Sequence, residues 1–202
     1  MLLSVSLAFV AGVVLTGLMR RYALAKRLLD IPNERSSHTV TTPRGGGLAM
    51  VASFALVLVV QVLFGGLEQR LATAVLPAAL IVAAVGFLDD HNDVSVRGRI
   101  LVHLLAVAWA VYWLGEVALV PLPQHLLALG WPGRLLAVLA VVWFLNLFNF
   151  MDGIDGIAAA EAAFVAFGGA WLALMSGLHD LAFALLVLGA AALGFLVWNW
   201  YP

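Results

Sequence analysis

Four polar side chains recur at every third position between residues 146 and 156, in a short stretch that separates two apolar runs. They are Asn146, Asn149, Asp152 and Asp155, and two glycines, Gly153 and Gly156, accompany them. Carboxylate and amide oxygens suit a divalent cation and also bind polar substrates. Asn and Asp are common turn residues too, but a plain helical hairpin needs no such set at strict spacing. We therefore predict a cation or polar-substrate site here.

A second acidic group, GFLDDHND at residues 86–93, ends another apolar run. Negative charges this close favour a bound cation or a proton held on one carboxyl group, and either use suits catalysis. The alternative is a solvated helix end whose charges pair with Arg97 and Arg99. Because aspartate beside hydrocarbon is costly and usually functional, we predict that Asp89 and Asp90 are catalytic.

A third polar segment, upstream of both, combines glycines 45–47 with basic residues. Backbone N–H groups at the start of a helix bind anions. Arg35, His38 and Arg44 add positive charge for a phosphate-bearing substrate. The alternative is a flexible start to a helix, with arginines that mark membrane topology and contact anionic lipid.

Membrane helices are the elements that must position these residues. Hydrophobic residues make up 64% of the 202 and charged residues 10%, and the mean hydropathy is +1.08, which excludes an ordinary soluble protein. A net charge of -1 gives no basic face for nucleic acid, and the lack of cysteine excludes disulfides. A span needs about 20 apolar residues. We predict an all-α polytopic membrane bundle, one domain over residues 1–202, with spans near 2–19, 47–67, 71–88, 100–120, 135–150, 154–176 and 181–198.

The distribution of basic residues predicts the orientation of these spans. Eight of the ten Lys and Arg residues lie in the first and third connections. By the positive-inside rule, the N-terminus lies outside and the first, third and fifth connections are cytoplasmic. The three polar segments are therefore expected on one face of the membrane. Topology alone explains the basic residues on that face, but not the acidic clusters.

Together these motifs resemble those of the polyprenyl-phosphate N-acetylhexosamine-1-phosphate transferases. The resemblance covers essentially the whole chain and rests on DIPNERSSH at 30–38, PRGGG at 43–47, GFLDD at 86–90 and NLFNFMDGIDG at 146–156. It is closest to the bacterial glycosyltransferase 4 branch that initiates O-antigen or related surface glycans. It implies an enzyme of the bacterial inner membrane that transfers sugar 1-phosphate from a UDP-N-acetylhexosamine to undecaprenyl phosphate and releases UMP. Mg²⁺ is the implied cofactor, with Mn²⁺ as an alternative, and a homodimer is left open.

The resemblance also implies roles for individual residues. Asp89 and Asp90 match the family's aspartate pair, as a base or as organisers of the nucleophile and metal. Asn149 matches a metal-site asparagine. The residues expected to bind substrate are Arg35, His38, Arg44, Asn146, Asp152, Gly153 and Asp155. A lipid phosphate is already ionised near neutral pH, so whether an aspartate acts as a base stays open.

The sequence departs from the family pattern after residue 198. Family members continue from a Trp-Asn-Trp-like stretch into a Gly-Asp motif and a later loop with His and Arg, whereas this sequence reads WNWYP at 198–202. We expect this chain to be inactive alone, as a fragment or a degenerate product. Two other classes stay open, an ion- or proton-coupled transporter and a non-catalytic membrane scaffold. A transporter favours acidic residues at span centres, whereas here they cluster at one face.

Overall fold

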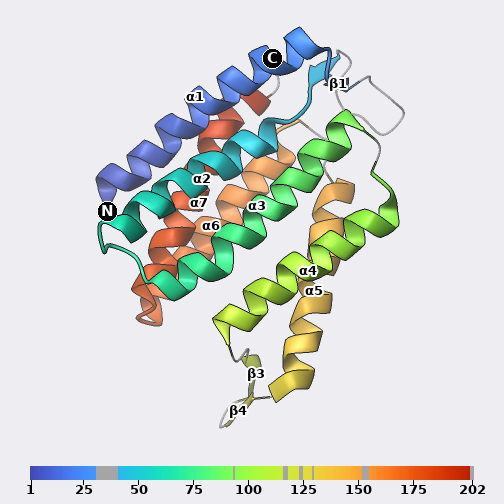
Figure 1. Ribbon diagram of the computed structural model, residues 1–202. Helices are drawn as coiled ribbons and strands as arrows, with labels where there is room; N and C mark the ends of the chain where they lie inside the picture. Colours follow the sequence, from blue (N-terminus) through green and yellow to red (C-terminus); the bar gives the residue numbers. More distant parts are fainter. Residues whose placement is uncertain are drawn as a thin grey trace.

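The computed structural model describes residues 1–30, 41–92, 94–115, 118–122, 125–128, 130–151 and 155–200. Seven helices in this part of the chain are long and apolar enough to cross a membrane, which confirms the predicted helical membrane bundle (Figure 1). They are α1 (Leu2–Lys26), α2 (Gly46–Leu63), α3 (Gln69–His91), α4 (Val96–Leu114), α5 (Gly130–Met151), α6 (Ile157–Met175) and α7 (His179–Asn199).

The boundaries differ most from the sequence prediction at α1 and α4. Helix α1 continues past residue 19 and ends only at Lys26, because the next residue, Arg27, has a left-handed backbone with φ of 57°. Helix α4 begins before residue 100, where the Ser95 hydroxyl accepts a hydrogen bond from the Gly98 N–H at 3.2 Å. It ends at Leu114 rather than near residue 120, because Gly115 has φ of 90° and turns the chain out of the helix.

Two short antiparallel strand pairs occupy connections between helices. Strand β1 (Leu29–Asp30) pairs with β2 (Thr42–Pro43), which brings the end of α1 next to the start of α2. Strand β3 (Ala118–Leu122) pairs with β4 (His125–Ala128) through an irregular register. The apolar residues that extended the predicted fourth span therefore belong to a hairpin.

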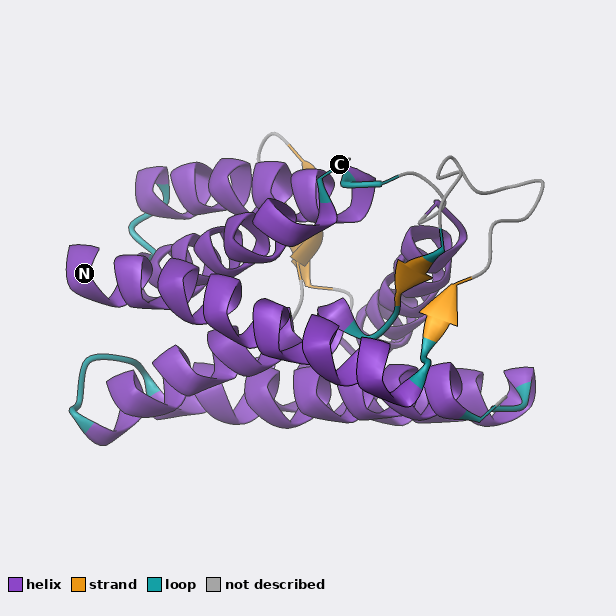
Figure 2. Cartoon of the chain, turned by 90° about the horizontal axis from the view of Figure 1, so that it is seen from above, coloured by secondary structure: helices purple, strands orange, loops and turns teal. Residues whose placement is uncertain are grey.

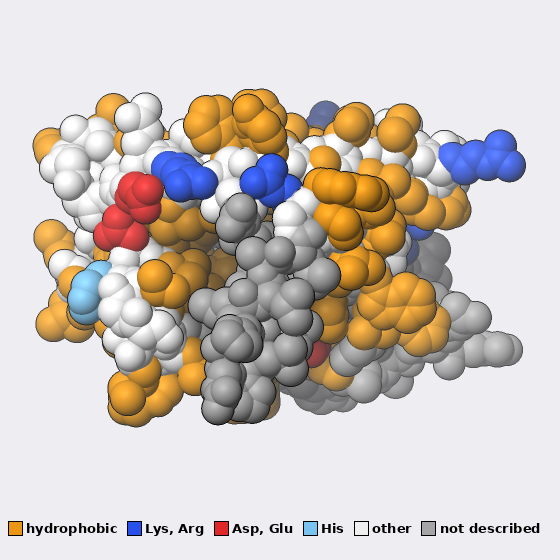
Figure 3. Space-filling model, turned by 90° about the horizontal axis from the view of Figure 1, so that it is seen from below, with side chains coloured by type: hydrophobic (Ala, Val, Ile, Leu, Met, Phe, Trp, Pro, Cys, Tyr) orange, Lys and Arg blue, Asp and Glu red, His pale blue; other side chains and the backbone are white. Residues whose placement is uncertain are grey.

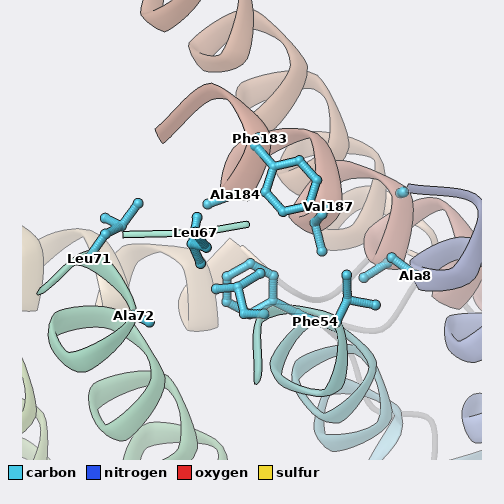
Figure 4. Close-up of a cluster of buried hydrophobic side chains, with 12 residues drawn as sticks. Ala8, Phe54, Leu67, Leu71, Ala72, Phe183, Ala184 and Val187 are labelled. Atoms are coloured by element: carbon cyan, nitrogen blue, oxygen red, sulfur yellow. The ribbon is translucent and has the colours of Figure 1, made fainter. Parts of the chain in front are cut away.

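Helix α7 packs against α1, α2 and α6 and is the most buried of the seven helices. Half of its most apolar segment is buried, the largest share among the seven helices. Figure 4 shows Phe54 of α2 and Phe183 and Val187 of α7 pointing into the same space. This cluster extends to α1 and α3, so four helices share one core.

Small residues let α1 and α7 approach almost to backbone contact. A Cβ atom added at Gly194 would lie 2.5 Å from the Phe9 carbonyl oxygen, 2.9 Å from the Val13 nitrogen and 3.0 Å from the Gly12 Cα. Close approach through small residues is a common way for membrane helices to associate. Nearby, the Trp198 indole N–H donates to the Val13 carbonyl oxygen at 2.8 Å.

Helices α4 and α5 lie at one side of the bundle (Figure 1), where α4 packs on both α3 and α5, and α5 packs chiefly on α4. Their shared core is small, with Val107 and Val111 of α4 against Ala137 and Val142 of α5. Seen from below, much of the described surface is hydrophobic, as expected for lipid-facing helices (Figure 3).

Polar contacts join this pair to α3. The Arg70 Nε donates to the Trp113 carbonyl oxygen at 2.7 Å, and its Nη2 donates to that of Leu114 at 3.2 Å. The Trp109 indole N–H donates to the Thr73 carbonyl oxygen at 2.9 Å. Arg70 thereby caps the C-terminus of α4, where unsatisfied carbonyls favour a cation.

Candidate active site

The three polar segments gather at one end of the bundle. Helices α1, α3, α5 and α7 finish at the end far from the N-terminus, and α2, α4 and α6 start there (Figures 1 and 2). Alternating direction along the chain produces this arrangement, as the count of spans predicts. Which side of the membrane this end faces stays a prediction.

The Asp89 side chain makes polar contacts that join α3 to the connection before α4 and to α4 itself. Its Oδ1 accepts a hydrogen bond from the Val94 N–H at 2.9 Å, and its Oδ2 accepts one from the Arg99 Nη1 at 2.5 Å. Both side chains are about one quarter exposed, Arg99 at 28% and Asp89 at 27%. The alternative interpretation of this acidic group was a helix end whose charges pair with Arg97 and Arg99, and the ion pair with Arg99 is present. Asp90 is half-buried and also interacts with another part of the chain.

An aromatic cluster lies beside this aspartate pair and ties it to α1. The rings of Phe87 and His91 are 4.3 Å apart between centroids, and the Tyr22 ring lies 6.4 Å from that of Phe87. The His91 Nδ1 is 2.8 Å from the Phe87 carbonyl oxygen, which can only accept, so Nδ1 carries a proton. The Tyr22 hydroxyl is 3.4 Å from Nε2.

Two of the three glycines at the start of α2 are required, Gly45 by its left-handed backbone and Gly46 by a close contact. Gly45 has φ of 90°, and a Cβ there would lie 3.5 Å from the Met19 Sδ. A Cβ at Gly46 would run into the Phe195 ring of α7. Gly47 has open space around it. The glycine run thus fixes how α2 starts against α1 and α7, beside an exposed Arg44 that also interacts with the protein.

The asparagines of the third segment lie in the last turns of α5, within the predicted span 135–150. Asn146 and Asn149 are exposed on the last turns of α5, and the Asn146 Nδ2 donates to the Val142 carbonyl oxygen at 2.8 Å. Asp155 lies in the turn directly before α6, and its Oδ2 is buried. The described members of the three-residue spacing therefore lie on the last turns of α5 and in the turn before α6.

Asn199 is a residue that the sequence reasoning missed. Its Oδ1 accepts a hydrogen bond from the Gly156 N–H at 3.1 Å, where α6 begins. Gly156 has φ of 77°, and a Cβ there would lie 3.3 Å from Leu196 and 3.4 Å from Trp200. The end of α7 thus holds the last part of the third segment. The only signal was an asparagine between two tryptophans, which says nothing about a partner 43 positions away.

Several predicted site residues lie outside the described residues: Arg35, His38, Asp152 and Gly153. Within the part that the structure describes, no three His, Asp or Glu side chains come together as a metal centre. No described contact joins Asp89 to the third segment either. The structure therefore brings the segments to one end of the bundle, without a complete metal-binding set among the described residues.

Comparison with known proteins decides which family these segments belong to. Residues 72–202 match the family described as glycosyl transferase family 4. The chain belongs to this family. The assignment made from the motifs is thereby confirmed.

Relatives of this glycosyl transferase family 4 chain are named as transferases, and two of the three described below carry a polyprenyl phosphate in their names. It is 31% identical to the probable undecaprenyl-phosphate N-acetylglucosaminyl 1-phosphate transferase of Bacillus subtilis, over 94% of the chain and 52% of the relative. It is 32% identical to the phospho-N-acetylmuramoyl-pentapeptide-transferase of Moorella thermoacetica, over 59% and 42%. It is 29% identical to the decaprenyl-phosphate N-acetylglucosaminephosphotransferase of Mycobacterium leprae, over 68% of the chain and 37% of the relative. The chain spans about half the length of the first of these relatives and less of the other two.

Proposed function

We propose that this chain serves the transfer of an N-acetylhexosamine 1-phosphate from a UDP-sugar to undecaprenyl phosphate, with release of UMP. The product is a lipid-diphosphate-sugar that starts a surface polysaccharide at the bacterial cytoplasmic membrane. One observation carries the proposal. In a member of glycosyl transferase family 4, the acidic end of α3, the glycine start of α2 and the Asn/Asp segment of α5 and α6 lie at the same end of a membrane bundle.

The proposed reaction is a phosphoryl transfer. An oxygen of the lipid phosphate attacks the sugar-linked phosphorus, a new P–O bond forms, and the bond from that phosphorus to the bridging oxygen breaks as UMP leaves. Such a reaction depends mainly on positioning and on neutralising charge. A bundle end that presents basic residues and backbone N–H groups to phosphates at the membrane surface suits it.

The contacts of Asp89 favour one of its two proposed roles. Both of its oxygens already accept hydrogen bonds, from Val94 and from Arg99. Asp89 is therefore arranged to fix the geometry of the α3–α4 corner and to hold a guanidinium at the site, rather than to receive a proton. Asp90 remains the aspartate of the pair that we propose for direct contact with the reacting phosphates.

The other substrate contacts follow from the sequence motifs. We propose that Arg44, together with Arg35 and His38, binds phosphate near the start of α2. Asn146, Asp152, Gly153 and Asp155 are proposed for the nucleotide and sugar. Asn149 supplies an oxygen of the kind that Mg²⁺ prefers, and Asp152 and Asp155 are the carboxylates that follow it in the sequence. Bound Mg²⁺ would neutralise diphosphate charge.

The proposal is tested by transfer of radiolabel from UDP-N-acetylglucosamine to undecaprenyl phosphate in proteoliposomes with Mg²⁺. The 202-residue chain is compared with any longer product of its reading frame, and Mg²⁺-dependent binding of the nucleotide is measured in parallel. We expect binding by both forms, transfer by the longer one, and loss of transfer in Asp90→Asn. If neither form binds UDP-sugars or transfers label from any UDP-N-acetylhexosamine, the proposal is wrong.

A further inference from the structure

An apolar groove of about 290 Å³ lies between α1 and α2. Every residue along it is apolar apart from the hydroxyl of Tyr22. It is lined by Leu15, Leu18, Met19, Tyr22, Leu48, Ala49 and Ala52. Leu18 is 53% exposed and Tyr22 40%, so the groove opens on the surface of the bundle rather than into its core. The groove therefore offers an open apolar surface along which an apolar chain can lie.

One end of this groove reaches the candidate active site. Met19, which lines it, lies directly under Gly45 at the start of α2, with its Sδ 3.5 Å from the position of a Gly45 Cβ. Tyr22, at the same end, packs against Phe87 and His91 of α3. Phe87 lies two residues before Asp89. A chain lying in the groove would thus deliver its head group beside the aspartate pair.

The charges around this end suit an anionic head group. Arg20 and Arg21 follow Met19 on α1 and are exposed, and Arg44 precedes Gly45. The guanidinium of Arg20 lies 5.7 Å from the centre of the Trp198 ring, which holds it at this end of the bundle. Basic side chains at the mouth and apolar side chains along the walls match a lipid whose phosphate sits at the membrane surface.

We propose that the groove between α1 and α2 seats the first isoprene units of the acceptor lipid, a polyprenyl phosphate. This inference rests on the proposed function, because a reacting phosphate has to be carried to the aspartates. The groove is far smaller than a whole polyprenyl chain, so the remainder of the chain lies in the bilayer. The contribution of the groove is to align the lipid, so that its phosphate meets the start of α2 and the end of α3.

Photo-cross-linking tests the proposal without any need for turnover. A polyprenyl phosphate carrying a photoreactive group on its first isoprene unit is added to the chain in phosphatidylglycerol vesicles, and labelled peptides are mapped by mass spectrometry. We expect labels within residues 15–22 and 48–52, competed by unlabelled polyprenyl phosphate and not by added phosphatidylglycerol. Equal competition by phosphatidylglycerol, or labels confined to other helices, would overturn the proposal.

Filling the groove provides the second arm. Ala52→Leu extends a side chain into it, and Ala84→Leu makes the same change at an exposed position of α3 outside the groove. We expect Ala52→Leu to lose most of the cross-link and Ala84→Leu to keep it. In a form that transfers sugar, Ala52→Leu should raise the KM for polyprenyl phosphate several-fold and leave that for the UDP-sugar unchanged.

The two arms separate this inference from the proposed function. Cross-linking in the groove without transfer by any form would support the proposed lipid site and contradict the proposed transferase function. Transfer accompanied by labels elsewhere, or by an equal loss of cross-linking in Ala52→Leu and Ala84→Leu, would support the transferase function and contradict the groove as the lipid site.

Discussion

The half of the bundle around α7 and the α4–α5 pair are held together in different ways. Around α7, glycines allow near backbone contact, as at Gly194 against α1, and a shared core joins four helices. In the α4–α5 pair, α4 packs along α3 and is also bound to it by polar contacts such as those of Arg70, whereas α5 is held chiefly by α4 through a small core. The candidate site lies across both parts, so it has one tightly packed wall around α7 and one wall whose outer helix, α5, is held chiefly by α4.

The site residues divide between these two parts. Gly46 and Gly156 lie against the end of α7, whereas Asn149 is carried by α5, which packs chiefly on α4. Asp89 lies at the junction, because it belongs to α3 and binds Arg99 of α4. Local opening free energies differ between regions with dense and sparse packing. We therefore expect the α4–α5 wall to open more easily than the α7 wall.

The largest effect is expected where α1 meets α7. Gly194→Ala forces these helices apart and should lower the free energy of unfolding by about 2 kcal/mol, since overpacking outweighs the gain in helix propensity. Unfolding in mixed micelles, followed by tryptophan fluorescence, measures it. Gly168→Ala in α6 is the matched control, because nothing lies within 4 Å of its Cβ, and it should be neutral or stabilising by up to about 1 kcal/mol. Equal effects of the two would contradict the packing difference.

Removing Arg70 should affect the other part of the bundle. Arg70→Gln removes the charged donor that binds the carbonyl oxygens of Trp113 and Leu114, at a cost of about 1.5 kcal/mol for this exposed side chain. Hydrogen exchange by mass spectrometry should then be faster in α4 and α5 and unchanged in α1 and α7. Arg70→Lys keeps the positive charge but cannot donate from two nitrogens at once. Its exchange rates in α4 and α5 should lie between those of the unchanged protein and those of Arg70→Gln. Faster exchange throughout the bundle would mean that the α4–α5 pair is not a separate unit.

A smaller, local effect is expected at the start of α6. Asn199→Ala removes the acceptor for the Gly156 N–H and should cost about 1 kcal/mol, as the loss of a helix cap does. Exchange should speed up in the first turn of α6. Asn199→Asp retains an acceptor oxygen and should preserve protection. Protection of α6 that is unaffected by Asn199→Ala would show that Leu196 and Trp200 alone hold this segment.

The sequence could predict the seven spans because hydropathy is read over long windows and a bilayer admits only helices or closed barrels. It could not place the end of α4, because residues 118–122 continue the hydrophobic run although they form strand β3. The Asp89–Arg99 pair was foreseen as an alternative, since both residues flank one short connection. The Asn199–Gly156 bond was not, because a contact between distant segments leaves no local pattern.

The junction between the two parts offers the test with the smallest expected change in stability. Arg99→Gln breaks a partly exposed ion pair, so it should lower the free energy of unfolding by less than about 1 kcal/mol. Its effect on transfer should be larger, because Asp89 then keeps only the Val94 N–H and the corner between α3 and α4 loosens. Arg97→Gln removes an exposed charge two positions away and serves as the control. Equal transfer rates for the two variants would show that the ion pair only joins the helices. A loss confined to Arg99→Gln at nearly unchanged stability would show that the attached wall acts on the site through Asp89.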